Sequence, residues 1–160
     1  MESLDIFAET NPAFCSIVLF NFCKGYKSEA SDGVDFPLIL LPLPIVLSGD
    51  LESSFVNTRV DTGFFSWIDR NPTILLSLAD RIQDTLTITR NAVEFGVSKS
   101  ILRVADTGKI KSDDNGLSKK KFPLSSSKMG RAYINSLRFG QWLGQINSAT
   151  TIYNHLGLEI

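Results

Sequence analysis

The sequence predicts a mainly α-helical single domain with one small β-hairpin, arranged like a winged helix-turn-helix. Three observations predict this class. Apolar residues recur at helical spacing through most of the 160 residues, and two Asn-Pro pairs mark helix starts. Asp106-Thr107-Gly108 is a turn signal between two short alternating segments, which is typical of a hairpin. A chain of this length can bury one ordinary core.

The first helix is expected to follow a short acidic lead of residues 1–10. Asn11 is a good N-cap and Pro12 a good first helical residue, so the helix begins there. Its apolar side chains surround most of the cylinder, which predicts burial on more than one side: Phe14, Ile17, Val18, Phe20, Phe22 and Tyr26. Prolines within residues 36–47 then predict either a short helix with a break or two turns separated by a kink.

Residues 48–60 are interpreted as a polar linker. After it, Asp61 or Thr62 is expected to cap a short helix through Trp67 and Ile68. Trp67 is predicted to be a core residue, because an aromatic ring at this place can clamp the short helix against the next one. Asn71-Pro72 predicts the start of that next helix, whose apolar residues have helical spacing.

The threonines at 85, 87 and 89 alternate with apolar residues, and we expect the helix to end there. A further helix is predicted from Arg90 to about Val97, followed by a hairpin around residues 106–108. Two helices followed by a basic hairpin is the order that suggests the winged helix. A polar, lysine-rich loop over residues 112–124 is followed by a long helix to about Ile146, which a serine among Ser125 to Ser127 is expected to cap. A last helix runs from Ala149 to His155.

Charge is divided unevenly along the chain. Residues 1–89 contain five Lys/Arg and twelve Asp/Glu, whereas residues 90–160 contain eleven and five. Such asymmetry indicates either that the two ends face different partners, one of them polyanionic, or that the two halves complement each other within one domain.

Residue types that carry catalytic or metal chemistry are sparse. His155 is the single histidine, and no nucleophile-base pairing, zinc spacing, calcium loop or phosphate loop is recognisable. We therefore expect no enzyme, no metal site and no cofactor. Cys15 and Cys23 are expected to be buried free thiols. The acidic lead and the absence of a long apolar run predict a cytoplasmic protein that does not insert into membranes.

The best site candidate in the sequence is a basic cluster in the second half of the chain. It can hold phosphates of DNA, it can meet an acidic patch on a protein partner, or it can be a solvated face. Its members are Lys109 and Lys111 on the hairpin, Lys119, Lys120 and Lys121 in the loop, and Lys128, Arg131 and Arg138 along the following helix.

Two apolar features concern packing. Phe55, Phe64 and Phe65 lie near the polar linker and fit either an ordinary core or an interface core. Gly140-x-x-x-Gly144 predicts that another helix approaches closely.

An ordered set of landmarks resembles the middle components of bacterial three-component ABC-ATPase systems, to which the small subunit of Lamassu-type phage defence is similar. The resemblance covers roughly the whole chain. The landmarks are Asn11-Pro12-Ala13-Phe14, Gly25-Tyr26, Phe36-Pro37-Leu38, Leu41-Pro42-Leu43-Pro44-Ile45, Trp67-Ile68, Asn71-Pro72, Arg81, Thr89-Arg90-Asn91-Ala92, Ile152-Tyr153 and Leu156-Gly157-Leu158.

This resemblance implies a non-catalytic adaptor that docks on an SMC-like or Rad50-like ABC ATPase and links it to an effector, often a nuclease. The chain would then contact DNA as part of the assembled complex. The rival hypothesis is a stand-alone winged-helix DNA-binding regulator. It needs a recognition helix rich in Arg, Asn and Gln before the hairpin, and residues 90–99 also carry several apolar side chains there.

Overall fold

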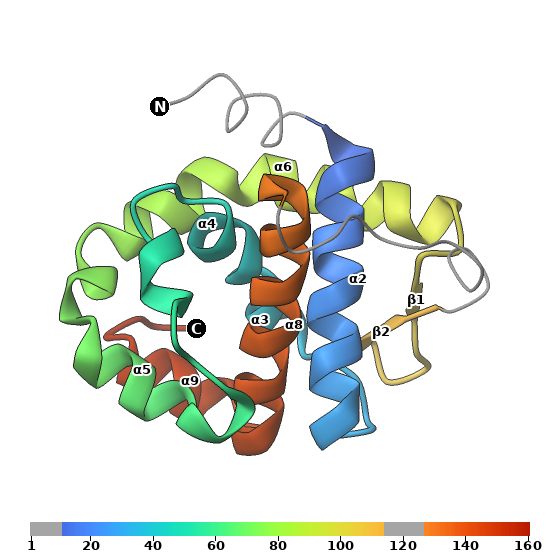
Figure 1. Ribbon diagram of the computed structural model, residues 1–160. Helices are drawn as coiled ribbons and strands as arrows, with labels where there is room; N and C mark the ends of the chain where they lie inside the picture. Colours follow the sequence, from blue (N-terminus) through green and yellow to red (C-terminus); the bar gives the residue numbers. More distant parts are fainter. Residues whose placement is uncertain (1–10, 114–126) are drawn as a thin grey trace.

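Two long helices, α2 (Pro12–Glu29) and α8 (Lys128–Ile146), pack side by side at the centre of the computed structural model. The structure describes residues 11–113 and 127–160. A third long helix, α6 (Leu78–Ser98), crosses behind this pair, and the hairpin lies on the other side of α2 from α8 (Figure 1). α2 is therefore buried on several sides, as its apolar pattern predicted.

Glycines on both central helices allow their close approach. A Cβ atom on Gly140 would lie 2.0 Å from the Phe22 carbonyl oxygen, and one on Gly25 would lie 2.1 Å from that of Leu137. At Gly144 the corresponding distance to the Tyr26 carbonyl oxygen is 2.8 Å. Each of these distances is shorter than a methyl group tolerates, so the predicted close helix contact is confirmed, with Gly25 as an additional member.

The beginning of α2 follows its sequence signals. The Asn11 Oδ1 atom accepts hydrogen bonds from the amides of Ala13 and Phe14 at 3.0 and 3.2 Å, and Pro12 is the first helical residue. The proline-rich segment forms two short helices separated by a break, α3 (Phe36–Ile39) and α4 (Pro42–Val46), as expected. Proline at the first turn costs no hydrogen bond, and a second helix starts at Pro42 for that reason.

The segment interpreted as a polar linker is more ordered than predicted. It contains the 3₁₀ turns η1 (Glu52–Phe55) and η2 (Val60–Thr62), and Leu51 and Phe55 are buried. Helix α5 (Phe64–Arg70) follows, but neither Asp61 nor Thr62 caps it. Its N-cap is Gly63 with φ of 78°, and the Thr62 hydroxyl instead accepts a hydrogen bond from the Arg59 amide at 2.9 Å.

Asn71-Pro72 does not start an α-helix. The Asn71 side chain donates to the Trp67 carbonyl at 2.9 Å and so closes α5, and Pro72–Leu75 forms the 3₁₀ turn η3. α6 begins only at Leu78, after Ser77 adopts a left-handed conformation with φ of 59°. The same residue types thus end one helix here, whereas at residue 11 they begin one.

The two helices predicted between residues 71 and 97 are instead the single helix α6 over its 21 residues. The Thr85 hydroxyl donates to the Arg81 carbonyl at 2.9 Å, so this threonine bonds back into the helix rather than ending it. The helix-helix-hairpin order on which the winged-helix expectation rests is therefore reduced to one helix and a hairpin, and the winged-helix arrangement stays a prediction.

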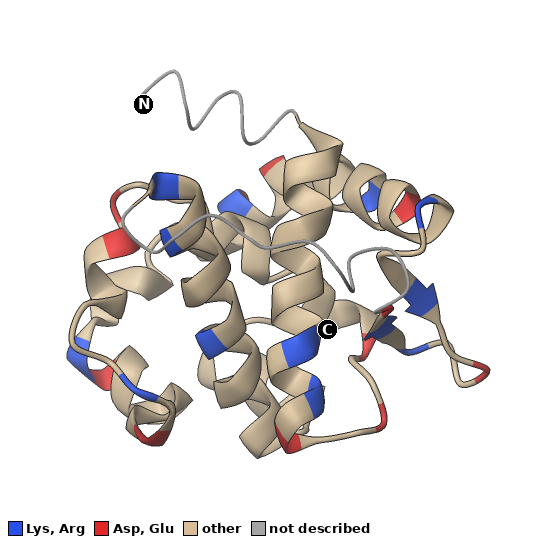
Figure 2. Ribbon diagram, turned by 45° about the vertical axis from the view of Figure 1, so that its right-hand side comes forward, with Lys and Arg blue, Asp and Glu red and all other residues tan. Residues whose placement is uncertain are grey.

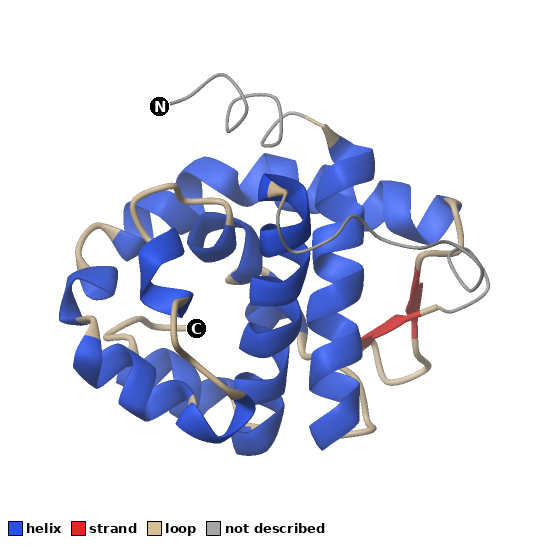
Figure 3. Ribbon diagram, in the orientation of Figure 1, coloured by secondary structure: helices blue, strands red, loops and turns tan. Residues whose placement is uncertain are grey.

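The hairpin is confirmed, with antiparallel strands β1 (Leu102–Val104) and β2 (Ile110–Ser112) (Figure 3). Val34 extends this sheet, because its amide and carbonyl both bond to Ile110 on the other edge of β2, at 2.8 and 2.9 Å. α8 begins at the Ser127 cap, as expected. The final helix, α9 (Ala149–His155), is followed by Gly157 with φ of 71°.

Candidate functional site

The structure divides the basic residues predicted as one cluster. Lys109 and Lys111 lie at the hairpin, whereas Lys128, Arg131 and Arg138 belong to α8. α2 contacts both α8 and β2 and lies between them in Figure 1. The hairpin and α8 therefore present their charges on separate sides of α2. The other three candidates, Lys119, Lys120 and Lys121, lie outside the described residues.

The arginines of α8 are engaged within the fold. Arg131 Nε lies 2.6 Å from Glu52 Oε1, an ion pair between α8 and η1. Arg138 donates from Nη1 to the carbonyl oxygen of Thr58 and, at 3.1 Å, to its hydroxyl. Both side chains thus bind the segment of residues 52–62 to α8. Lys128 is the first residue of α8 and is partly exposed.

Other residues on this side of α8 make the same kind of connection. The Trp142 indole donates to the Arg59 carbonyl oxygen at 3.0 Å, and the side-chain amide of Gln145 donates to the Val60 carbonyl oxygen at 3.2 Å. Below these bonds, the Phe55 ring stacks on Trp142 with centroids 5.9 Å apart, and Trp67 contacts both rings. We call this region, residues 52–62 together with the α8 side chains that bind it, the fastened segment.

Trp67 is fully buried, which confirms that it belongs to the core. Its indole donates to the Ser54 hydroxyl at 3.2 Å, so its polar atom is satisfied as well. Phe55 and Phe64 are also buried, and their core interpretation holds. Phe65 differs, because 42% of its surface is exposed.

Several residues of the family-like sequence pattern hold together elements that are distant in the sequence. Arg81 binds Asp50 at 2.8 Å and joins α6 to the segment after α4. Hydrogen bonds from Arg81 and then from Ser48 hold the pKa of the Asp50 carboxyl well below its usual value. The Tyr26 hydroxyl donates to Asn147 Oδ1 at 2.7 Å. The Tyr153 hydroxyl of α9 donates to a carbonyl oxygen of α3. Arg81, Tyr26 and Tyr153 of this pattern therefore have structural roles, because each side chain joins two distant parts of the chain.

The hairpin offers a contrasting basic surface. Arg103 pairs directly with Lys111 across the two strands, and beyond them the Ala105 amide donates to the Lys109 carbonyl oxygen at 2.8 Å. Because side chains alternate between the two faces of a strand, Arg103, Lys109 and Lys111 share one face. The other face carries the buried Leu102 and Ile110. We call the first face the basic hairpin face.

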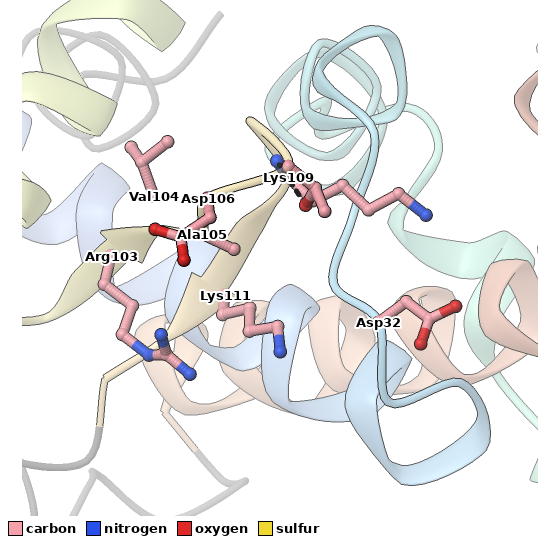
Figure 4. A pocket seen from close by; sticks show the side chains of 8 residues that line it. Asp32, Arg103, Val104, Ala105, Asp106, Lys109 and Lys111 are labelled. Atoms are coloured by element: carbon pink, nitrogen blue, oxygen red, sulfur yellow. Dashed lines mark hydrogen bonds between the residues drawn. The ribbon is translucent and has the colours of Figure 1, made fainter.

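None of the three cations of the basic hairpin face has an ion-pair partner among residues 11–113 and 127–160. They line an open depression of about 460 Å³ with Asp32, Asp106 and Thr107 (Figure 4). The sequence interpretation missed Arg103. The signal was present, since Arg103 occupies the polar position of Leu102-Arg103-Val104 as Lys109 and Lys111 do around Ile110.

Reactive side chains elsewhere are packed into the structure. Cys15 and Cys23 are buried and form no disulfide, and burial raises the pKa of the Cys23 thiol far above its usual value. The His155 ring lies against Phe65 with centroids 4.7 Å apart, and against Phe64 at 5.7 Å. Within the described part of the chain, no group of His, Cys, Asp or Glu could hold a metal ion. No helix in that part is both long and apolar enough to cross a bilayer.

Comparison with known protein families gives a match over almost the whole chain. The sequence matches the family described as ABC-three component (ABC-3C) system Middle Component 3 over residues 6–160. No curated protein and no solved structure matches the chain. Because the match covers nearly all 160 residues, the chain belongs to the Middle Component 3 family of ABC-three component systems, which implies partner subunits that include an ABC ATPase.

Proposed function

We propose that this protein is a non-catalytic adaptor that links an SMC-like or Rad50-like ABC ATPase to an effector, a nuclease, in a cytoplasmic anti-phage complex of the Lamassu type. The observation that carries the proposal is family membership over residues 6–160. A middle component of a three-component system acts through contacts with the other components, so its function is expected to lie in binding surfaces.

The state of the reactive side chains supports the non-catalytic part of the proposal. A buried thiol with a raised pKa is a poor nucleophile, because the thiolate is the reactive form. His155 packs against two aromatic rings and belongs to α9, a helix of seven residues near the end of the chain. Arg81, Arg131 and Arg138 bind other parts of the same chain, so their charges serve the fold.

Coexpression of the chain with its genomic neighbours, followed by affinity purification and size-exclusion chromatography, tests the proposal. We expect one elution peak that contains this chain and an ATPase, and no ATP hydrolysis by this chain alone. Arg103→Gln/Lys111→Gln should remain in that peak, since it alters the basic hairpin face without touching the core. Elution of the chain as a lone species in every combination would overturn the adaptor proposal and favour the stand-alone regulator.

A further inference from the structure

We propose that the basic hairpin face binds phosphates of a nucleic-acid backbone through Arg103, Lys109 and Lys111. The site goes beyond the adaptor function, because it gives this chain a ligand of its own. It does not depend on which ATPase or effector the chain joins.

The first support is the direct pairing of like charges. Arg103 and Lys111 are register partners, and side chains directly opposite each other on two antiparallel strands have Cβ atoms about 4.5–5.5 Å apart. Like charges at that distance repel, and neither residue has an ion-pair partner among the described residues to offset the repulsion. An anion placed between the two side chains would convert this repulsion into attraction on both sides.

The second support is that the cations are held on a fixed platform. Gly33 packs on the same face, since a Cβ atom there would lie 3.0 Å from both Lys109 Cβ and Lys111 Cγ. The neighbouring residue, Val34, bonds twice to Ile110 of β2. The aliphatic parts of the two lysines therefore lie beside a backbone that is hydrogen-bonded at both edges of β2. Phosphate binding does not have to order the strands first.

The third support is the shape of the surface. Figure 4 shows the side chains of Arg103 and Lys111 extending in the same direction from neighbouring strands, with Lys109 and Asp32 beyond Lys111. The depression is open, so it suits a ligand that continues beyond it, such as a polymer backbone, better than an enclosed small molecule. Asp32 and Asp106 also line it and would repel phosphates that approach their carboxylates, so the phosphates are expected beside the three cations.

A nucleic acid fits these observations better than an acidic protein segment. The hairpin lies at the edge of the helical body in Figures 1 and 2, with α2 behind β2 and the basic face turned away from the buried Leu102 and Ile110, so a duplex can reach that face. Phosphate contacts require donors and positive charge but no particular base, and a guanidinium with two ammonium groups supplies both. Binding by this face alone would therefore be independent of sequence and sensitive to salt.

Two charge-matched double variants of the full chain test the proposal. Arg103→Gln/Lys111→Gln removes two charges from the basic hairpin face, and Arg59→Gln/Arg70→Gln removes two exposed charges, one just before η2 and one at the end of α5. The probe is a fluorescein-labelled 30-base-pair DNA duplex, and its anisotropy is measured from 50 to 200 mM NaCl. The hairpin variant should bind at least about tenfold more weakly at 100 mM, with a salt slope smaller by roughly 1.8, about 0.9 per lost phosphate contact.

The control double variant should keep the wild-type affinity and slope. Asp106→Asn should bind more tightly than wild type, because it removes a negative charge from the border of the site. Equal binding by the hairpin and control variants, or no duplex binding by wild type at 50 mM NaCl, would overturn the proposal. Competition by ATP or inorganic phosphate as effective as competition by unlabelled duplex, compared per phosphate, would also overturn it and assign the face to a small phosphate ligand.

The purification described above separates this inference from the adaptor function. If the hairpin double variant still copurifies with the ATPase but loses duplex binding, both proposals stand. If it keeps duplex binding and loses the ATPase, the face binds an acidic protein surface and the nucleic-acid proposal is overturned. Wild-type chain that binds duplex but never copurifies with an ATPase would contradict the adaptor function alone.

Discussion

The arginines of α8 and the cations of the hairpin carry the same charge in different surroundings. Arg131 meets Glu52 at 2.6 Å and Arg138 meets Thr58, whereas Arg103 and Lys111 face each other. Charge that is paired inside a fold is bound by the chain's own acceptors and is unavailable to a partner. Basic residues of one sequence cluster therefore divide into a structural set and a surface set, according to the acceptors that the fold brings near them.

The α8 arginines are structural only if the fastened segment packs on the core. Trp67→Ala tests this packing, because the Trp67 ring contacts Phe55 of the segment and Trp142 of α8, and it has the largest expected effect. The side chain is fully buried among Phe55, Trp142 and Phe139. We expect a loss of about 3–5 kcal/mol in the free energy of unfolding, the usual range for removing a large buried aromatic. Urea denaturation of the isolated chain measures it. An unchanged midpoint combined with lost binding to the ATPase would show that Trp67 acts in an interface instead.

Arg138→Met tests whether the α8 arginines are structural. It keeps the length of the aliphatic chain but leaves the Thr58 carbonyl without its charged donor, so we expect a loss of about 1–3 kcal/mol. Arg59→Met is the matched control in the same segment, because the Arg59 side chain is 84% exposed. A surface substitution of this kind should change stability by less than about 0.5 kcal/mol. Equal denaturation midpoints for the two variants would remove the distinction between the two basic regions.

The smallest effect is expected at the basic hairpin face. Arg103→Gln/Lys111→Gln relieves repulsion between register partners, so the free energy of unfolding should stay the same or rise by about 0.2–1 kcal/mol. Thermal melts at low and high salt measure this, and any gain should shrink at high salt as the repulsion is screened. A loss of stability comparable to that of Arg138→Met would show that these cations also have internal partners.

Local chemistry alone determined several features of this protein. Asn11 and Pro12 begin α2, Ser127 caps α8, and Asp106-Thr107-Gly108 turns the hairpin. In each case the cause lies within a few residues: a side-chain acceptor beside unpaired amides, or a glycine with φ of 86° at the turn. The spacing of Gly140 and Gly144 on one helix face likewise predicted a close neighbour, though not that the neighbour is α2.

The tertiary structure decided the rest, because the same residue types act differently in different surroundings. Asn71-Pro72 repeats the signal at residue 11, yet Asn71 bonds backward to Trp67 and closes a helix. The threonines of α6 have a strand-like alternation, but the helix continues through them and buries Thr89. The sequence alone could not distinguish the roles of Arg138 and Lys111, because both belong to the same predicted basic cluster. Only the fold determines that Thr58 lies beside Arg138, and that the residue opposite Lys111 is another cation.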